Sequence, residues 1–311
     1  MTNGGSNQPR ATRNDLREAA REKARILREE QKKREKRNKL LIQGGVIVAV
    51  LVVAGLIGTL IFNSIKPAGP GPANMASDGI LLVAGDEGAI TAVETPALDA
   101  GEEPTPTVPD DSGTVANIVT YIDYLCPFCG QFETTNSDSI RTMVESGAAT
   151  LEVHPIALLT NKSAGTQYSL RAANAAACVA NTSPNSFFDY NELLFANQPE
   201  ETSTGLDNSE LKALAKEAGV SSLSTIEQCI DDTSFKKWVQ DATTRALTEP
   251  VPNSDLEAIK GTPTVLVNGK QYEGSLTDPA EFQSFVLQAT GETFSESTST
   301  PSPTPTPTPA Q

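Results

Sequence analysis

Two cysteines separated by two residues form the part of this sequence best suited to chemistry. They belong to Cys126-Pro127-Phe128-Cys129, and two thiols at this spacing can close a disulfide and open it again. The residues before the motif, 115–124, are rich in β-branched and aromatic side chains, which predicts a strand. The residues after Pro127 carry apolar side chains at helical spacing, which predicts a helix. The motif is therefore expected where a strand passes into a helix.

This position makes Cys126 an acidic thiol. Pro127 fits the first turn of the helix, where its missing N–H costs nothing. Unpaired N–H groups and the positive end of the helix dipole then favour the thiolate of Cys126. A charge at a helix end gains at most about 2 kcal/mol, and one pKa unit corresponds to about 1.36 kcal/mol. The dipole alone should lower the pKa of Cys126 by about one, so a larger lowering needs direct hydrogen bonds to the sulfur.

The alternative to disulfide chemistry is half of a zinc site. The sequence has four cysteines and one histidine. Cys178 and Cys229 form no second Cys-x-x-Cys pair, and His154 lies well beyond Cys129. This spacing favours redox chemistry over zinc, and we expect neither a metal nor a cofactor. His154 falls in a predicted strand, where packing or a satisfied hydrogen bond is favoured over a redox role.

The first 62 residues predict a membrane anchor. Residues 1–39 contain 13 Lys and Arg against 6 Asp and Glu, so of the net charge of −15 the rest of the chain carries −22. That acidic remainder argues against nucleic-acid binding. Residues 40–62 carry no charge and would span about 34 Å as a helix, against roughly 30 Å of hydrocarbon. A cleaved signal peptide is the alternative, but no small-residue cleavage site follows. The basic side should stay cytoplasmic, which places the catalytic domain and all four cysteines outside.

Disulfides persist in such a compartment. We favour a structural disulfide between Cys178 and Cys229, with two buried free thiols as the alternative. Residues 63–114 are expected to form an extracytoplasmic linker that contains a short β-hairpin at 79–93. Residues 291–311 end the chain as a Ser/Thr/Pro-rich tail, which is expected to be disordered.

The remaining pattern alternates between strands and helices. A second strand is expected at 150–156, and a hairpin at 262–272 turns at Asn268-Gly269. A last helix is expected at 280–289. Between the second strand and the hairpin, Asp207 and Glu210 have the spacing of a capping box. Four helices are expected in this part, at 164–180, 185–196, 207–218 and 224–247.

This α/β order resembles that of DsbA-type thiol-disulfide oxidoreductases. The resemblance is carried by Asp123 to Cys129, by the block from Ala172 to Gln198, and by Gly261 to Gly269 with its Gly-Thr-Pro. It implies a thioredoxin-like fold over 115–290 with a helical domain inserted at about 160–255, preceded here by one transmembrane helix. It also implies that Pro263 is cis and faces the cysteines, and that Thr262 offers backbone groups to the substrate.

The resemblance implies a division of work between the two thiols. Cys126 would form the mixed disulfide with a substrate protein, and Cys129 would resolve it or hand over the disulfide. Two positions depart from the family. Thr120 stands where many relatives have an acidic residue, so proton transfer to or from Cys129 would rely on water or another group. Phe128 stands where the strongest oxidants have histidine, so the reduction potential does not carry over.

The leading functional prediction is a dithiol oxidase that introduces disulfides into unfolded or reduced exported proteins. Its expected partner is a membrane protein that reoxidises it, such as a quinone-linked thiol oxidase. A disulfide reductase or isomerase would use the same residues at a lower potential. A non-catalytic domain that binds metal or polypeptide is a further alternative, and a redox-silent Cys-x-x-Cys would reveal it.

Overall fold

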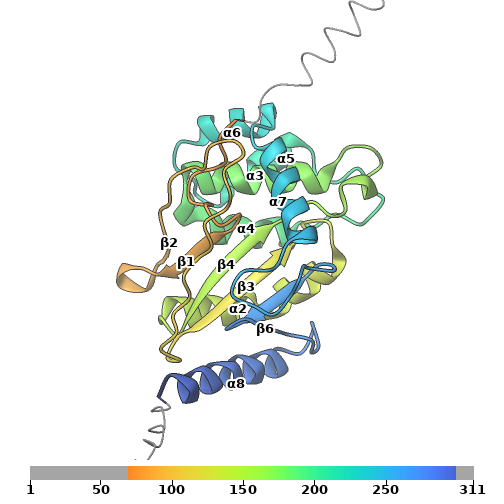
Figure 1. Ribbon diagram of the computed structural model, residues 1–311. Helices are drawn as coiled ribbons and strands as arrows, with labels where there is room; N and C mark the ends of the chain where they lie inside the picture. Colours follow the sequence, from red (N-terminus) through yellow and green to blue (C-terminus); the bar gives the residue numbers. More distant parts are fainter. Residues whose placement is uncertain (1–68, 299–311) are drawn as a thin grey trace, which may run out of the picture. The chain divides into compact units, whose positions relative to one another are not determined.

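A computed structural model describes residues 69–298, and in this part of the chain the strands form one six-stranded mixed sheet flanked by helices (Figure 1). The strands are β1 (Ile80–Ala84), β2 (Ile90–Ala92), β3 (Ala116–Ile122), β4 (Ala149–Pro155), β5 (Thr264–Val267) and β6 (Lys270–Gln271). The α-helices are α2 (Pro127–Glu145), α3 (Tyr168–Thr182), α4 (Phe187–Ala196), α5 (Asn208–Glu217), α6 (Leu223–Asp232), α7 (Lys236–Thr248) and α8 (Pro279–Thr298).

The strand that leads to the cysteines lies in the middle of this sheet. The strand order is β2-β1-β4-β3-β5-β6. β3 pairs in parallel with β4 and antiparallel with β5. Six of its seven residues are buried, because helices or loops cover both faces, and this accounts for its nearly continuous run of β-formers. The predicted α/β architecture, with a helical block inserted before the last hairpin and helix, is confirmed.

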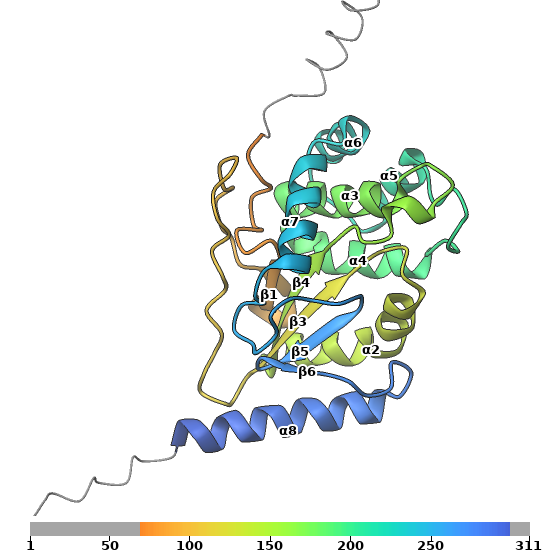
Figure 2. The same ribbon diagram turned by 45° about the vertical axis from the view of Figure 1, so that its right-hand side comes forward.

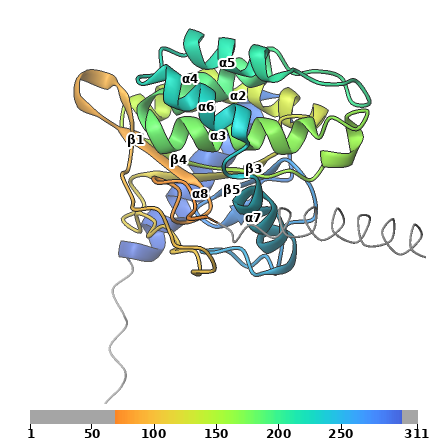
Figure 3. The same ribbon diagram turned by 90° about the horizontal axis from the view of Figure 1, so that it is seen from above.

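Alternate residues of β3 serve two different cores. Ile118 and Ile122 point to the face that carries α2 and α8, where Phe132 and Phe282 pack edge to face with their ring centroids 5.2 Å apart. Tyr121 points to the other face and packs against residues next to α7. Seen from above, α4 and α7 lie on opposite sides of the line of strands (Figure 3). The β3–α2 junction is thus supported from both faces of the sheet.

The predicted hairpin at 79–93 is present, but it belongs to the sheet. β1 and β2 pair antiparallel around a short 3₁₀ turn at Asp86–Gly88. β1 also pairs with β4, with Ile80 opposite Val153. The assignment of this segment to a linker at 63–114 is corrected, because the apolar side chains of β1 are buried against the main core.

The inserted block contains five α-helices within the described residues, and Figure 2 shows it at the opposite end of the sheet from α8. The capping box at Asp207 and Glu210 is confirmed. The single helix expected at 224–247 is wrong, because α6 ends at Asp232 and α7 begins at Lys236. Thr233 between them has a left-handed backbone with φ of 47°. The two helices also pack differently, since Ile226 joins the main core while Val239 joins a smaller one.

Four predicted segments lie wholly or partly outside the described residues. These are the basic segment 1–39, the transmembrane helix 40–62, residues 63–68 of the predicted linker and the part of the tail beyond residue 298. None of the helices within 69–298 is both long and apolar enough to cross a membrane. The tail was expected to begin at 291, but α8 continues to Thr298. The last turns of α8 contact the turn between β5 and β6, where Thr293 accepts a hydrogen bond from the Asn268 side chain at 3.0 Å.

Candidate active site

Cys126 is the N-cap residue of α2, and Pro127 is the first residue of the helix. The structure therefore places both residues where the sequence predicts them. Cys126 is 5% exposed, and Cys129, one turn further along the helix, is 0% exposed. Neither cysteine is in a disulfide. The structure thus contains the reduced dithiol, with Cys126 as its outer sulfur.

The loop before β5 brings Thr262 and Pro263 against this outer sulfur. The peptide bond between the two residues is cis. The Cys126 sulfur lies 3.1 Å from the carbonyl oxygen of Thr262. A cavity of about 240 Å³ opens beside this loop, and residues 256, 258–264 and 271 line it. The two distant motifs that the sequence analysis selected therefore meet at one sulfur atom.

The environment of Cys126 makes its thiol acidic. Its hydrogen bond with Cys129 is the largest influence, and it outweighs the opposing effect of burial. The side chain of Thr262 and the backbone N–H groups of Phe128 and Cys129 act in the same direction. Together they lower the pKa of Cys126 from 9.0 to about 6. This exceeds what the helix dipole alone supplies, and direct hydrogen bonds to the sulfur account for the difference.

Cys129 is affected in the opposite sense. Burial is the main reason that its pKa lies well above its usual value, and the hydrogen bond to Cys126 adds to the rise. Its sulfur receives the backbone N–H of Asp123 at 3.5 Å. The two thiols of the motif therefore differ strongly in acidity.

Thr120, in β3, is 1% exposed, and its hydroxyl oxygen has no hydrogen-bond partner within residues 69–298.

Gln198 is a site residue that sequence reasoning missed. It follows α4 in the inserted block, and its side-chain nitrogen donates to the carbonyl oxygens of Cys126 at 2.9 Å and Tyr124 at 3.2 Å. In the sequence, Gln198 is the last residue of the Ala172–Gln198 stretch that resembles the DsbA-type family. No local signal identifies it, because the contact depends on how the inserted block folds back onto the start of α2.

Two exposed apolar side chains lie close to the motif in the chain or in space. Phe128, between the cysteines, is 57% exposed. Leu158 is 37% exposed, and its neighbour Leu159 donates its N–H to the Asp123 carboxylate at 2.8 Å.

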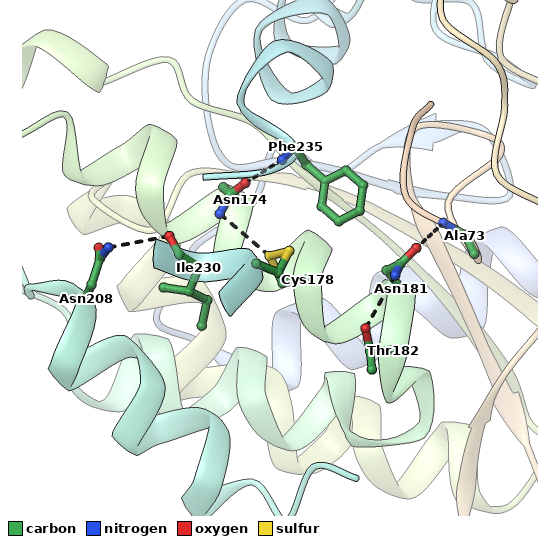
Figure 4. Close-up of a disulfide and its surroundings, with 9 residues drawn as sticks. Ala73, Asn174, Cys178, Asn181, Thr182, Asn208, Ile230 and Phe235 are labelled. Carbon is green, nitrogen blue, oxygen red and sulfur yellow. Dashed lines mark hydrogen bonds between the residues drawn. A yellow bond between two sulfur atoms is a disulfide. The ribbon is translucent and has the colours of Figure 1, made fainter. Parts of the chain in front are cut away.

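Cys178 and Cys229 form a disulfide that joins α3 to α6 (Figure 4). Their Cα atoms are 5.9 Å apart, and the bond closes a span of 51 residues. Asn174 lies beside it, with its side-chain nitrogen 3.7 Å from the Cys178 sulfur. Its side-chain oxygen accepts the N–H of Phe235 at 2.8 Å, which ties the α6–α7 connection to the same place.

His154 lies in β4 and has a structural environment. Its Nε2 is 3.3 Å from a carboxylate oxygen of Glu152, and its ring stacks on Tyr121 with a centroid distance of 4.4 Å. The Glu152 carboxylate also accepts hydrogen bonds from Ser77 and Thr107. This satisfied pairing is the arrangement that the sequence analysis favoured for His154. Within residues 69–298, no group of three or more His, Cys, Asp or Glu side chains is placed to hold a metal ion.

Comparisons with solved structures find similar chains. Oxidised DsbA of Mycobacterium tuberculosis is 28% identical, with a TM-score of 0.49, and the match covers 71% of this chain and all of that one. The reduced disulfide bond oxidoreductase DsbG of the same organism is 29% identical, with a TM-score of 0.49, over 75% of this chain and 97% of that one.

Among curated proteins, the matches are to much longer chains. The Na(+)/H(+) antiporter NhaA 1 of Salinispora arenicola is 28% identical over 165 residues, which is 51% of this chain. NhaA 3 of Salinispora tropica is 27% identical over 157 residues, or 50% of this chain. The match spans 21% of the length of each antiporter.

The family comparison covers the site and the sheet that carries it. The family described as thioredoxin matches residues 111–287, more than half of the chain. The matched range includes the Cys-x-x-Cys motif, the whole inserted block and the cis-proline loop. This protein belongs to the thioredoxin family.

Proposed function

We propose that this protein is a thiol-disulfide oxidoreductase that introduces disulfides into exported proteins through Cys126 and Cys129. The main support is the contrast between the two thiols. Cys126 lies 3.1 Å from the Thr262 carbonyl with its pKa lowered to about 6, while burial raises the pKa of Cys129. The Cys126 sulfur is thus suited to be attacked by a substrate and to leave as a thiolate. The buried Cys129 sulfur is suited to be its partner in the enzyme disulfide.

The reaction starts from the oxidised enzyme. A substrate thiolate attacks the Cys126 sulfur, the Cys126–Cys129 bond breaks, and Cys129 leaves as a thiolate that takes up a proton. A second substrate thiolate then attacks the substrate sulfur of the mixed disulfide, and Cys126 leaves as a thiolate. Two electrons pass from the substrate dithiol to the enzyme, which ends in the reduced form that the structure contains. An external oxidant must then restore the enzyme disulfide.

The acidity of Cys126 gives the reaction its direction. A thiol with a pKa of about 6 is largely ionised at pH 7. Its ionisation favours the reduced enzyme about tenfold over a thiol that stays protonated, which corresponds to about 30 mV. This makes the oxidised enzyme a better oxidant. The contribution is moderate, so the remaining differences between the oxidised and reduced forms decide where the full potential lies.

The surroundings of Cys126 suit an extended polypeptide. Thr262 presents backbone groups next to the sulfur, and the cavity at residues 256–264 lies beside them. Phe128, two residues after Cys126 in the motif, adds an exposed apolar side chain. A substrate cysteine could therefore be held by backbone hydrogen bonds together with contacts to its apolar neighbours.

The proposed place of action is outside the cytoplasmic membrane, with residues 40–62 as the anchor and a membrane thiol oxidase as the recycling partner. The charge pattern of residues 1–39 supports this orientation. A membrane-impermeant thiol reagent should label reduced Cys126 in intact or wall-stripped cells. Labelling that requires cell lysis would reject the proposed orientation.

The equilibrium with glutathione tests the reaction itself. The purified domain is incubated in buffers of graded redox potential, and the Cys126–Cys129 disulfide is quantified by mass spectrometry, with Cys126→Ser as the control. A potential well above about −200 mV supports the oxidase, whereas one near −270 mV supports a reductase instead. Failure of the pair to exchange with glutathione would reject both activities and favour a binding domain.

A further inference from the structure

One buried carboxyl group beside the site has no part in the mechanism above. Asp123 is 0% exposed and lies three residues before Cys126, in the turn between β3 and α2. Its backbone contacts both cysteines. The carbonyl oxygen of Asp123 accepts the N–H of Cys126 at 2.9 Å, and the N–H of Asp123 points at the Cys129 sulfur at 3.5 Å. A change in the backbone angles at Asp123 would therefore move groups that contact both cysteines.

The side chain of Asp123 joins three separate parts of the chain. One carboxylate oxygen accepts the N–H of Leu125 at 2.8 Å and the hydroxyl of Ser169. The other accepts the N–H of Leu159 at 2.8 Å. Leu125 belongs to the same turn, Leu159 to the segment after β4, and Ser169 to the first turn of α3 in the inserted block. Burial raises the pKa of this carboxyl, and these hydrogen bonds oppose the rise.

The three hydrogen bonds restrict the turn strongly. An aspartate that accepts the N–H two residues later fixes the local backbone. Here the same carboxylate is also held at both oxygens from outside the turn. A buried acceptor with three donors cannot shift without leaving at least one of them unpaired. These contacts fix the backbone at Asp123 and therefore the direction in which its N–H points.

We propose that Asp123 is a positioning residue, whose side chain holds its own N–H on the Cys129 sulfur and so keeps Cys129 in place against Cys126. The proposal rests on the thiol-disulfide function proposed above. It assigns Asp123 no proton transfer. Asp123 acts through Cys129, and the inserted block supports it through Ser169.

The proposal predicts the sign of a measurable change. The contact with Cys129 is the largest influence that lowers the pKa of Cys126. If the Asp123 turn loosens, that contact weakens and the pKa of Cys126 rises. If Asp123 instead acted through its negative charge, removing the charge would stabilise the nearby thiolate and lower the pKa of Cys126. The positional and electrostatic roles therefore give opposite results.

Asp123→Asn separates these roles. The amide oxygen can still accept from Leu125 and Ser169, but the amide nitrogen would face the N–H of Leu159. The measurement is the rate of Cys126 alkylation in the reduced protein as a function of pH. We expect the midpoint to rise by about one pH unit above that of the wild type. An unchanged or lowered midpoint would overturn the proposal.

Two further variants complete the experiment. Ser169→Ala removes one of the three donors and should raise the midpoint in the same direction by a smaller amount. It also decides the question if Asp123→Asn does not fold, since an unchanged midpoint in Ser169→Ala then counts against the proposal. The double variant Cys178→Ser/Cys229→Ser loosens the same helix α3 without touching Asp123. Its midpoint should equal that of the wild type, and a rise there would show that general destabilisation explains the effect.

The wild-type protein separates this proposal from the proposed function. If wild-type Cys126 shows no ionisation below pH 8 and does not exchange with glutathione, the oxidoreductase function fails whatever Asp123 does. If the wild type ionises near pH 6 and exchanges, while Asp123→Asn keeps the same midpoint, only the positioning role of Asp123 fails.

Discussion

A Cβ atom on Gly130 would lie 2.2 Å from the side-chain oxygen of Gln198. The nitrogen of the same amide donates to the carbonyl oxygens of Tyr124 and Cys126. Gly130 thus leaves the space that lets a side chain from the end of α4 reach the start of α2. Cys126 is held from two sides, by Gln198 at its carbonyl and by Thr262 at its sulfur.

This contact predicts that Gly130 and Gln198 are coupled. Gln198→Ala removes two hydrogen bonds to the turn and should cost about 1–2 kcal/mol of unfolding free energy. Gly130→Ala should be destabilising in the wild type, because the methyl group displaces Gln198. In the Gln198→Ala background, the same methyl group finds space and should cost much less. Denaturant unfolding of the four proteins measures the coupling, and additive effects would contradict the contact.

Cys129→Ser is predicted to trap substrates. In the variant the acidic Cys126 thiolate can still attack a disulfide of an exported protein, which releases one substrate sulfur as a thiolate. The variant lacks the Cys129 sulfur that would displace the bound substrate in this direction of the exchange. Exported proteins should then remain attached to Cys126 and be released by a reducing agent. Cys126→Ser/Cys129→Ser is the control that should trap none. If cells carrying Cys129→Ser yield no more adducts than that control, the proposed exchange between Cys126 and exported proteins is wrong.

The stability of the reduced protein should depend on pH through Cys126. Its pKa falls from 9.0 to about 6 on folding. A lowered pKa contributes stability that is fully present above pH 9 and is lost as the pH falls from 9 to 6. Relative to Cys126→Ser, the reduced wild type should therefore gain roughly 2 kcal/mol between pH 6 and pH 9, once solvent screening is allowed for. A difference that stays constant across this range would contradict the lowered pKa.

Local patterns in the sequence were enough to predict the central architecture of the site. The β-branched run before Cys126 and the helical spacing after Pro127 predicted the strand–helix junction, because strand and helix periods are local properties. The strand-hairpin-helix order near Pro263 was equally local. Pairing between strands is not, so the sequence did not reveal that β1 lies beside β4 and extends the sheet.

The missed features depend on tertiary contacts. Gln198 and Asp123 are polar residues in ordinary local settings, and their roles appear only when α4, α3 and the β3–α2 turn come together. The break at Thr233 was missed because no glycine or proline marks it. There the N–H of Phe235 binds Asn174 beside the Cys178–Cys229 bond, which favours ending α6.

The Cys178–Cys229 bond is predicted to stabilise the inserted block without taking part in exchange. A closed loop of 51 residues contributes roughly 4 kcal/mol in the chain-entropy account, against about 2 kcal/mol for the short loop of the Cys126–Cys129 pair. Cys178→Ser/Cys229→Ser should lower the melting temperature by roughly 10 °C. Exchange of the remaining pair with glutathione should persist. Mass spectrometry of the untreated domain checks the bond directly, and free thiols at both positions would contradict it.

Glu133 gives a prediction of opposite sign to that of Cys126. It lies one turn after Cys129 on α2 and is buried. Burial is the main reason that its pKa rises from 4.5 to about 7. Its carboxyl group accepts hydrogen bonds from Ser137 at 3.1 Å and from Asn191 at 3.3 Å, both at the same oxygen. A glutamine can keep both of these bonds with its amide oxygen and carries no charge.

A raised pKa contributes stability that is fully present below pH 4.5 and is lost as the pH rises through 7. The Glu133→Gln variant has no such dependence at this position. Between pH 4.5 and pH 8 it should therefore gain roughly 3 kcal/mol relative to the wild type. Chemical denaturation at several pH values measures this gain. Asp138→Asn, which changes an exposed carboxylate on the same helix, is the matched control. If both variants follow the wild type in parallel at every pH, Glu133 ionises as freely in the folded protein as in the unfolded chain, and its burial does not influence the stability of α2.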